Sequence, residues 1–185
     1  MKQGLIIIDV QNDYFDNGNM TLVNTKIALQ NTLALQTFFR SQNKPIFYIQ
    51  HVNVRQGATF FKPNTPGINI HSRLLPIKVE NNEVIIRKHY PNSFKDTTLQ
   101  TELSRANIEQ VVICGMMSHM CVDSTTRQAA ELGYQPILIA DACATRDLTF
   151  QSITVKAEQV QIAFMSALAN FSDVYNTQQF MAINN

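Results

Sequence analysis

The stretch QVVICGMMSHMCVDSTTRQAAEL, residues 110–132, decides the fold class of this chain. Its first part, 110–114, is continuously apolar and rich in β-branched residues, which predicts a strand buried on both faces. The part after Cys121, 122–132, predicts a helix that ends at Gly133. Cys121 then lies where a strand turns into a helix. We expect the free N–H groups and the helix dipole there to stabilise a thiolate, which would make Cys121 a nucleophile.

Strands and helices alternate through the rest of the chain. The predicted strands are 4–10, 45–51, 84–87, 136–140 and 173–175, and the predicted helices are 22–42, 98–106, 152–169 and a last turn near Gln178. This order predicts one α/β domain over 1–185, a three-layer α-β-α, Rossmann-like arrangement. We expect a mainly parallel six-stranded sheet with helices on both faces. The long irregular segment 52–82 is expected to form a pocket wall or a lid.

The composition excludes several classes of protein. Of the 185 residues, 45% are hydrophobic and 16% are charged, and the net charge is +1. No basic cluster favours nucleic acid or an anionic membrane as a partner, and no apolar run reaches the ~20 residues of a membrane span. The three cysteines form no Cys-x-x-Cys motif, so we expect reduced thiols in a cytoplasm. The N-terminus runs directly into the first predicted strand, so no signal peptide is expected.

Four reactive side chains follow the ends of predicted strands. Asp9 ends the first strand, His51 ends the second, Lys88 follows the third and Cys121 follows the fourth. In an open parallel sheet the ligand site lies beyond the carboxyl ends of the strands, so these groups should converge there. This convergence predicts an enzyme that acts on a small molecule.

The residue types suit acyl transfer to water through a thioester. Asp9 is the candidate acid–base group, which would take the thiol proton and later give it to the leaving group. Lys88 is the candidate cation, expected to keep Asp9 ionised and to lower the pKa of Cys121. The backbone N–H groups of Cys121 and Met117 are expected to form the oxyanion hole.

Three motifs together resemble the isochorismatase-like cysteine hydrolases, a superfamily that includes nicotinamidases, N-carbamoylsarcosine amidohydrolases and isochorismatases. They are IIIDVQNDYF at 6–15, KHYPNSF at 88–94 and CGMMSHMCVDSTTRQAA at 114–130, with DACAT at 141–145 in support. The resemblance implies that Asp9, Lys88 and Cys121 are a catalytic triad. It also implies a cis peptide bond between Met116 and Met117, and assembly as a homodimer or homotetramer.

One departure from the family pattern concerns metal. Nicotinamidases carry a metal site with an Asp-Trp-His type motif, whereas this chain has no Trp and no acid in HVNVR, residues 51–55. His51, His71, His89 and His119 do not reproduce the ligand spacing. We therefore expect no metal and no cofactor, and nicotinamide becomes a less favoured substrate. The isochorismatase branch proper lacks the nucleophilic thiol, so Cys121 favours cleavage of an amide-like C–N bond.

Other side chains are candidates for binding the substrate, namely Gln11, Phe15, His51, Phe60, Phe61, Tyr90 and His119. For His51 a structural role is the stronger interpretation, and for Phe15 and His119 a structural role and a site role are equally favoured. Cys114 and Cys143 are expected to be structural. The alternatives to an amide hydrolase are an isochorismatase-type hydrolase, a nicotinamidase, a binding or scaffold protein with little turnover, and a redox sensor based on Cys121.

Overall fold

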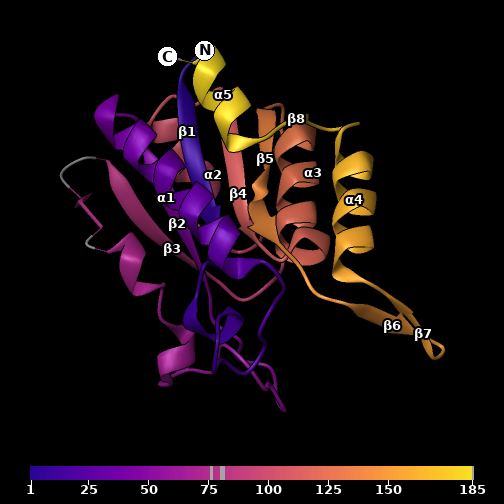
Figure 1. Ribbon diagram of the computed structural model, residues 1–185. Helices are drawn as coiled ribbons and strands as arrows, with labels where there is room; N and C mark the ends of the chain where they lie inside the picture. The colour runs from indigo at the N-terminus through magenta and orange to yellow at the C-terminus, as the bar shows by residue number, and fades with distance from the viewer. Residues whose placement is uncertain (76, 80–81, 185) are drawn as a thin grey trace.

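The chain folds around a six-stranded sheet in the order β3-β2-β1-β4-β5-β8, shown in the computed structural model of Figure 1. The structure describes residues 1–75, 77–79 and 82–184. All neighbouring strands of this sheet run parallel. They are β1 (Gln3–Ile8), β2 (Ile46–His51), β3 (Glu83–Lys88), β4 (Gln110–Met116), β5 (Gln135–Ala144) and β8 (Asp173–Tyr175).

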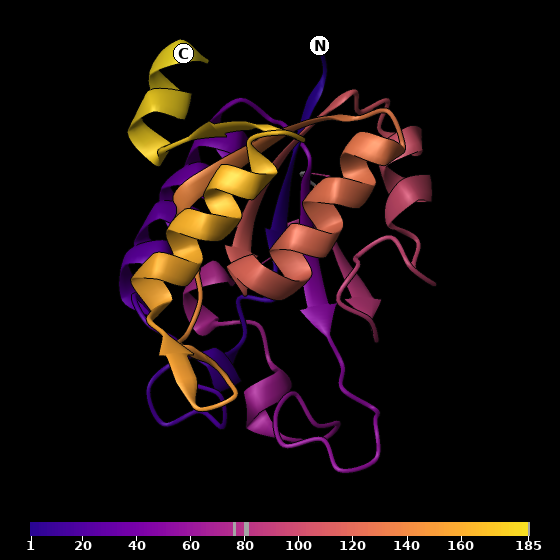
Figure 2. The ribbon, with the colours of Figure 1, turned by 90° about the vertical axis from the view of Figure 1, so that its right-hand side faces the viewer.

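Helices cover both faces of the sheet, which confirms the predicted α-β-α layers. The longer helices are α1 (Thr25–Ser41), α2 (Leu99–Arg105), α3 (Asp123–Glu131), α4 (Ala157–Leu168) and α5 (Thr177–Ile183). α1 and α5 share a core with one face, and α2, α3 and α4 share a core with the other. Figure 2 shows α3 and α4 side by side in front of the sheet.

β1 lies at the centre and explains why an unbroken apolar run is needed there. Leu5 and Ile7 point into the core that contains α1, whereas Ile6 and Ile8 point into the core that contains α2 and α3. Successive side chains of a strand alternate between faces, so a strand covered on both sides must be apolar at every position.

Short helical turns lie at the carboxyl edge of the sheet. They are the 3₁₀ turns η1 (Asn12–Tyr14), η2 (Pro66–Ile68) and η3 (Ser72–Leu74) and the π-helical turn η5 (Ser118–Val122). The predicted irregular segment 52–82 contains η2 and η3, and its residues 76 and 80–81 lie outside the described part of the chain. In both views the strand arrows point toward the loops that contain η1 and η2. No helix in the described ranges is long and apolar enough to cross a membrane.

The prediction of one helix over 152–169 was wrong at its start. A two-stranded antiparallel hairpin, β6 (Leu148–Phe150) and β7 (Ile153–Val155), projects from the body, and α4 begins at Ala157. The run Ile-Thr-Val in β7 is β-branched, which favours a strand. Asp147 then fixes the helix start, because its Oδ1 accepts a hydrogen bond from the Ala157 N–H at 2.8 Å.

The fifth strand was predicted too short. β5 continues past the predicted end at 140 as far as Ala144, and its register against β4 shifts between Ile113 and Gly115. Gly115 has φ +123°, and a Cβ there would lie 2.0 Å from the Ile8 carbonyl oxygen. This glycine lets β4 pass close to β1 just before the turn that contains Cys121.

Candidate active site

Four strand ends bring the predicted reactive groups together. Asp9 follows β1 directly, and its left-handed backbone (φ +50°) turns the chain out of the strand. His51 and Lys88 are paired in register at the ends of β2 and β3. Cys121 lies in the π-helical turn between β4 and α3 rather than at the first residue of the helix. The sheet therefore gathers a carboxylate, an imidazole, an ammonium and a thiol at one edge.

Lys88 contacts both Asp9 and His51. Its side chain is fully buried, and its ammonium lies 2.8 Å from Asp9 Oδ2, 3.0 Å from His51 Nδ1 and 3.0 Å from the Tyr90 carbonyl oxygen. These three partners match the three N–H donors of an ammonium group. Burial opposes the charge, yet the Asp9 carboxylate raises the pKa of Lys88 above its ordinary value. Lys88 is therefore a fixed cation.

Asp9 is ionised beside this cation. Burial alone would raise the pKa of Asp9, but the Lys88 ammonium holds it below its ordinary value. Apart from the ion pair with Lys88, neither carboxylate oxygen accepts a hydrogen bond within the described structure. A buried carboxylate with unused acceptor capacity is rare and invites a chemical explanation. Asp9 is placed to receive a proton.

Cys121 does not have the low pKa that its sequence position suggests. Burial and the Asp9 charge raise the pKa of Cys121 well above its ordinary value, and Lys88 offsets only part of this effect. The thiol is 4% exposed, so solvent does not stabilise a thiolate. This raised pKa runs against the expectation of a resting thiolate, which counted the cation and the helix end but not the burial. In the resting site Cys121 is a protonated thiol beside a carboxylate that can accept its proton.

His51 contacts the other groups through its Nδ1. Its Nδ1 accepts from the Lys88 ammonium, because an ammonium has no lone pair, so the imidazole proton is assigned to Nε2. Cys121 Sγ lies 4.0 Å from the same Nδ1. His51 therefore orients Lys88 and lines the site.

The turn before Cys121 has an ordered backbone. The peptide bond between Met116 and Met117 is cis. The Met117 carbonyl accepts hydrogen bonds from the N–H groups of Met120 and Val122. Ser118 is fully buried, and its Oγ lies 2.5 Å from Gln161 Oε1 and 3.2 Å from the Ala144 carbonyl. α4 and β5 thus hold the turn from behind.

Gln11 has a structural position. Its amide donates to the carbonyls of His51 at 2.9 Å and Ile68 at 2.7 Å, and its Oε1 accepts from the His51 N–H at 2.8 Å. Both amide hydrogens are thereby used, and the side chain is fully buried. Gln11 ties the end of β2 to the loop that contains η2.

The aromatic candidates for substrate binding differ in their burial and in what they contact. Phe61 is fully buried, and its ring centroid lies 6.0 Å from that of His51 and 5.0 Å from that of Phe60. Phe15 packs on the ring of His71 at 4.4 Å. Tyr90 directs its carbonyl to Lys88, whereas its ring is 38% exposed under the Lys95 ammonium. Phe61 therefore packs beside His51, whereas the ring of Phe15 contacts His71 and that of Tyr90 contacts Lys95.

His119 lies within the π-helical turn η5 that also contains Cys121. Its Nδ1 is 2.6 Å from Thr145 Oγ1, and its ring meets the Phe164 ring edge-on. Burial and the nearby Arg146 charge lower the pKa of His119 to about 4. His119 is therefore neutral at physiological pH.

Three residues at this edge were missed by sequence reasoning. Buried Asp13 accepts hydrogen bonds from the N–H groups of Phe61 and Asn19, at 2.6 and 3.1 Å. Tyr14 is also buried. Its burial and the charges of Cys121 and Asp9 raise its pKa well above the ordinary value. Arg146 follows β5 and has a buried, unpartnered Nε. The first two lie within the motif 6–15, where no separate role was predicted for them. Arg146 directly follows the motif 141–145.

One set of described side chains has metal-ligand geometry. An oxygen of Asp9, a ring nitrogen of His51 and Sγ of Cys121 lie within 4.8 Å of one another. The Lys88 ammonium, however, already contacts Asp9 and His51. A metal ion here would have to displace a fully buried lysine, so these residues fit a protein-borne cation better than a metal.

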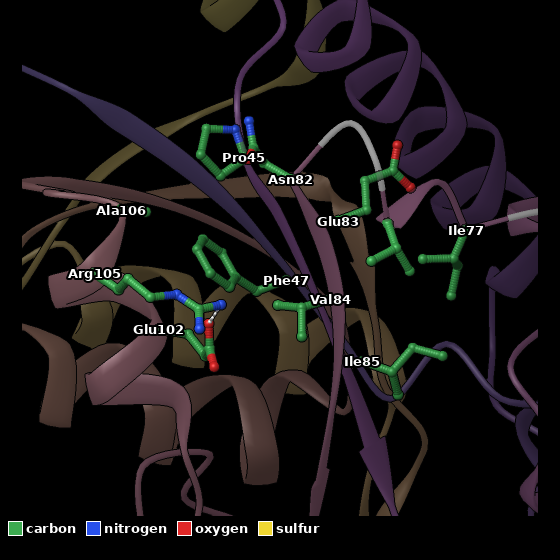
Figure 3. Close-up of a pocket in the computed structure, with 11 residues that line it drawn as sticks. Pro45, Phe47, Ile77, Asn82, Glu83, Val84, Ile85, Glu102, Arg105 and Ala106 are labelled. Carbon is green, nitrogen blue, oxygen red and sulfur yellow. Dashed lines mark hydrogen bonds and ion pairs between the residues drawn. The ribbon is translucent and has the colours of Figure 1, made fainter.

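A hollow elsewhere on the sheet is separate from this chemistry. The cavity of about 540 Å³ in Figure 3 lies between the start of β3 and α2. Phe47, Val84 and Ile85 form its apolar wall, and Glu102 and Arg105 pair at its rim. Lys88 stands at the opposite end of the same strand.

Comparison with known proteins gives a consistent result. The family model described as the isochorismatase domain matches residues 3–179, a span that includes Asp9, Lys88 and Cys121. The uncharacterized isochorismatase family protein YddQ of Bacillus subtilis (strain 168) is 43% identical over 182 residues, 98% of this chain and 99% of its own. Streptothricin hydrolase of Streptomyces noursei is 32% identical over 79% of this chain and 51% of its own length. The crystal structure of an isochorismatase from Pseudomonas putida KT2440 gives a TM-score of 0.87 at 33% identity, over 96% of this chain and 89% of that one.

Proposed function

Because the chain belongs to the isochorismatase family of hydrolases, we propose that it is a cysteine hydrolase that cleaves an amide-like C–N bond of a small molecule through a thioester. The observation that carries this proposal is the buried set of Asp9, Lys88 and Cys121. An ionised carboxylate with unused acceptor capacity, a fixed ammonium and a protonated thiol lie together at the strand ends. Relatives such as streptothricin hydrolase support hydrolysis as the reaction class.

The first half of the reaction transfers an acyl group to Cys121. Sγ attacks the carbonyl carbon while Asp9 takes the thiol proton, so no free thiolate has to accumulate. The N–H groups of Met117 and Cys121 stabilise the negative oxygen of the tetrahedral intermediate. The C–N bond then breaks, and protonated Asp9 gives its proton to the departing nitrogen. A thioester and an amine result.

The second half returns the enzyme to its resting state. Water attacks the thioester carbonyl while Asp9 takes one of its protons. The C–S bond breaks, the sulfur takes this water-derived proton from Asp9, and a carboxylic acid leaves. Lys88 keeps its proton throughout and stabilises the Asp9 carboxylate whenever that group is ionised.

The test is ammonia release from a panel of small primary amides, with hydroxylamine present in parallel samples to trap the acyl group as a hydroxamate. Wild type should release ammonia, and Cys121→Ser and Asp9→Asn should each lose at least about a hundredfold in kcat. Cys114→Ser is the control, because it removes a buried thiol of β4 without touching Asp9 or Lys88. Turnover that survives in Cys121→Ser would contradict the proposal. A well-folded wild type that turns over no amide would favour a binding protein with this fold.

A further inference from the structure

We infer that two copies of this chain associate by exchanging the β6–β7 hairpin. The hairpin of each copy packs into a hollow between α1 and α4 of the other copy. The hairpin, residues 148–155, is the arm, and the second surface is the α1–α4 hollow. The association does not depend on the proposed hydrolysis, because it concerns a surface away from the Asp9–Lys88 pair.

The arm has one apolar face and one polar face. Its cross-strand pairs are, in order from the base to the tip, Leu148–Val155, Thr149–Thr154 and Phe150–Ile153. Alternate positions of a strand share a face, so the first and third pairs together form a continuous apolar face. The two threonines lie on the other face, where their hydroxyl oxygens are 2.9 Å apart. A ribbon with this alternation is typical of a structure that packs one face against another surface.

The apolar face of the arm is uncovered within a single copy. Phe150 is 76% exposed and Ile153 is 71% exposed. Across the described residues, β6 and β7 pair only with each other, and Figure 1 shows the arm pointing away from the body. An isolated two-stranded hairpin is marginally stable in water, and exposed apolar patches mark interaction sites. The arm is therefore expected to pack against a partner.

The α1–α4 hollow offers an apolar surface on the same side of the molecule. It has a volume of about 600 Å³ and lies between the starts of α1 and α4, where residues 140–144 at the end of β5 also line it. β8 pairs with β5 only as far as Ile139, which leaves this part of β5 open to the hollow. Three exposed apolar residues form the rim, namely Val23, Ile27 and Ile162. Figure 2 shows the arm directly below α4.

A second copy of the chain fits these two surfaces better than another partner. A two-fold axis would place each arm on the other copy's hollow, so one contact covers both apolar surfaces. The arm sequence LTFQSITV has no charged residue, and Lys156 at its base is paired with Asp147 at 2.9 Å. An anionic membrane would find no free cation there. The arm and the residues that line the hollow number roughly twenty, which reaches the roughly 20–30 a side of a standard interface.

The α1–α4 hollow lies directly behind the turn that contains Cys121. Thr145 and Gln161 line the hollow. Thr145 Oγ1 lies 2.6 Å from His119 Nδ1, and Gln161 Oε1 accepts a hydrogen bond from Ser118 Oγ at 2.5 Å. The partner's arm would therefore cover the residues that hold this turn from behind.

Sedimentation velocity at micromolar concentrations tests the association without any substrate. Wild type should sediment as a dimer. Phe150→Asp in the arm and Ile162→Asp in the hollow should each raise its dissociation constant at least about thirtyfold, as expected for a central interface residue. Ile183→Asp is the matched control, because Ile183 on α5 is 62% exposed and Ile162 is 61% exposed. It should leave the dissociation constant unchanged, and circular dichroism should show that all three variants keep their helices.

A mixture of the two interface variants tests the exchange of arms. A Phe150→Asp chain beside an Ile162→Asp chain keeps one intact arm in one intact hollow, so mixing should restore part of the dimer that neither forms alone. A monomeric wild type, a dimer that survives both substitutions, or a mixture that stays monomeric would overturn the inference. A monomeric wild type that cosediments with phosphatidylcholine vesicles would assign the arm to a membrane instead and would also overturn it.

Discussion

At the scale of single residues, the site combines a buried ion pair, Asp9 and Lys88, with a thiol that keeps its proton. Lys88 has all three donors engaged, Asp9 is ionised with acceptor capacity to spare, and Cys121 holds its proton. In this arrangement the carboxylate has two opposed effects on the thiol. It disfavours a standing thiolate electrostatically, and it offers the base that removes the proton during attack.

The pH dependence of Cys121 alkylation follows from these directions. Burial and the Asp9 charge raise the thiol pKa, so the apparent pKa from iodoacetamide rates should lie above the ~8.5 of a free thiol. Asp9→Asn removes a negative charge and should lower it, while Lys88→Met removes a positive charge and should raise it.

Cys114 is the internal control in the same digest. Burial raises its pKa to about 12, and neither Asp9 nor Lys88 contributes to that shift. Its profile should therefore stay constant in both variants. A wild-type Cys121 that titrates below ~8.5 would show that the carboxylate is less important than the cation and the backbone N–H groups.

At the scale of elements, sequence patterns predicted most strands and helices but not their junctions. The apolar runs of β1 and β4 were sufficient, because a strand buried on both faces permits no other composition. The β6–β7 hairpin was missed, since the turn Gln151-Ser152 uses two non-glycine residues with positive φ and gives no glycine signal. The π-helical turn at Cys121 was also missed, because no local propensity distinguishes it from the first turn of an α-helix.

The candidate site was predictable in part for a related reason. Asp9, Lys88 and Cys121 follow strand ends, and topology alone brings such positions together. Asp13 was not predictable as a positioning residue, because its partner Phe61 is 48 residues away in the chain. The raised pKa of Cys121 depends on burial, which the chain acquires only on folding.

The close approach of β4 to β1 yields a prediction about Gly115. Gly115→Ala forces a side chain into φ +123° and against the Ile8 carbonyl. We expect a loss of about 2–5 kcal/mol in the free energy of unfolding, from left-handed strain of about 1–2 and overpacking of about 1–3. Urea denaturation followed by circular dichroism measures it.

Gly133→Ala is the matched control for this substitution. Gly133 also has positive φ (+89°), but a Cβ there meets nothing within 4 Å. It should show the strain of about 1–2 kcal/mol without the overpacking. Equal losses in the two variants would contradict the steric argument.

At the scale of the whole molecule, the Asp9–Lys88 pair contributes both to the candidate site and to the free energy of unfolding. The pKa of Asp9 is lowered from 3.8 and that of Lys88 is raised from 10.5. The stabilisation from Asp9 is therefore present above pH 3.8 and is lost as pH falls through its lower folded pKa. That from Lys88 is present below pH 10.5 and is lost as pH rises through its higher folded pKa.

A double-mutant cycle at pH 7 tests this link. Asp9→Asn and Lys88→Met each leave one buried charge without its partner and should each cost about 3–5 kcal/mol of unfolding free energy. The double variant removes both charges and should cost clearly less than the sum. Lys26→Met, which breaks the exposed pair with Asp16, should leave the urea midpoint unchanged. Strictly additive losses at 9 and 88 would mean that the two charges do not stabilise each other.

The cation of the site, Lys88, lies on β3, one of the two edge strands of the sheet. β3 pairs with β2 and has no strand on its other side within the described chain. Edge strands open locally with less free energy than central ones. In mild urea, therefore, Lys88 should withdraw from Asp9 while β1 and β4 still protect their amides from hydrogen exchange. Activity would then be lost at a lower urea concentration than the folded structure. The local stability of β3 would therefore limit the conditions under which this hydrolase works.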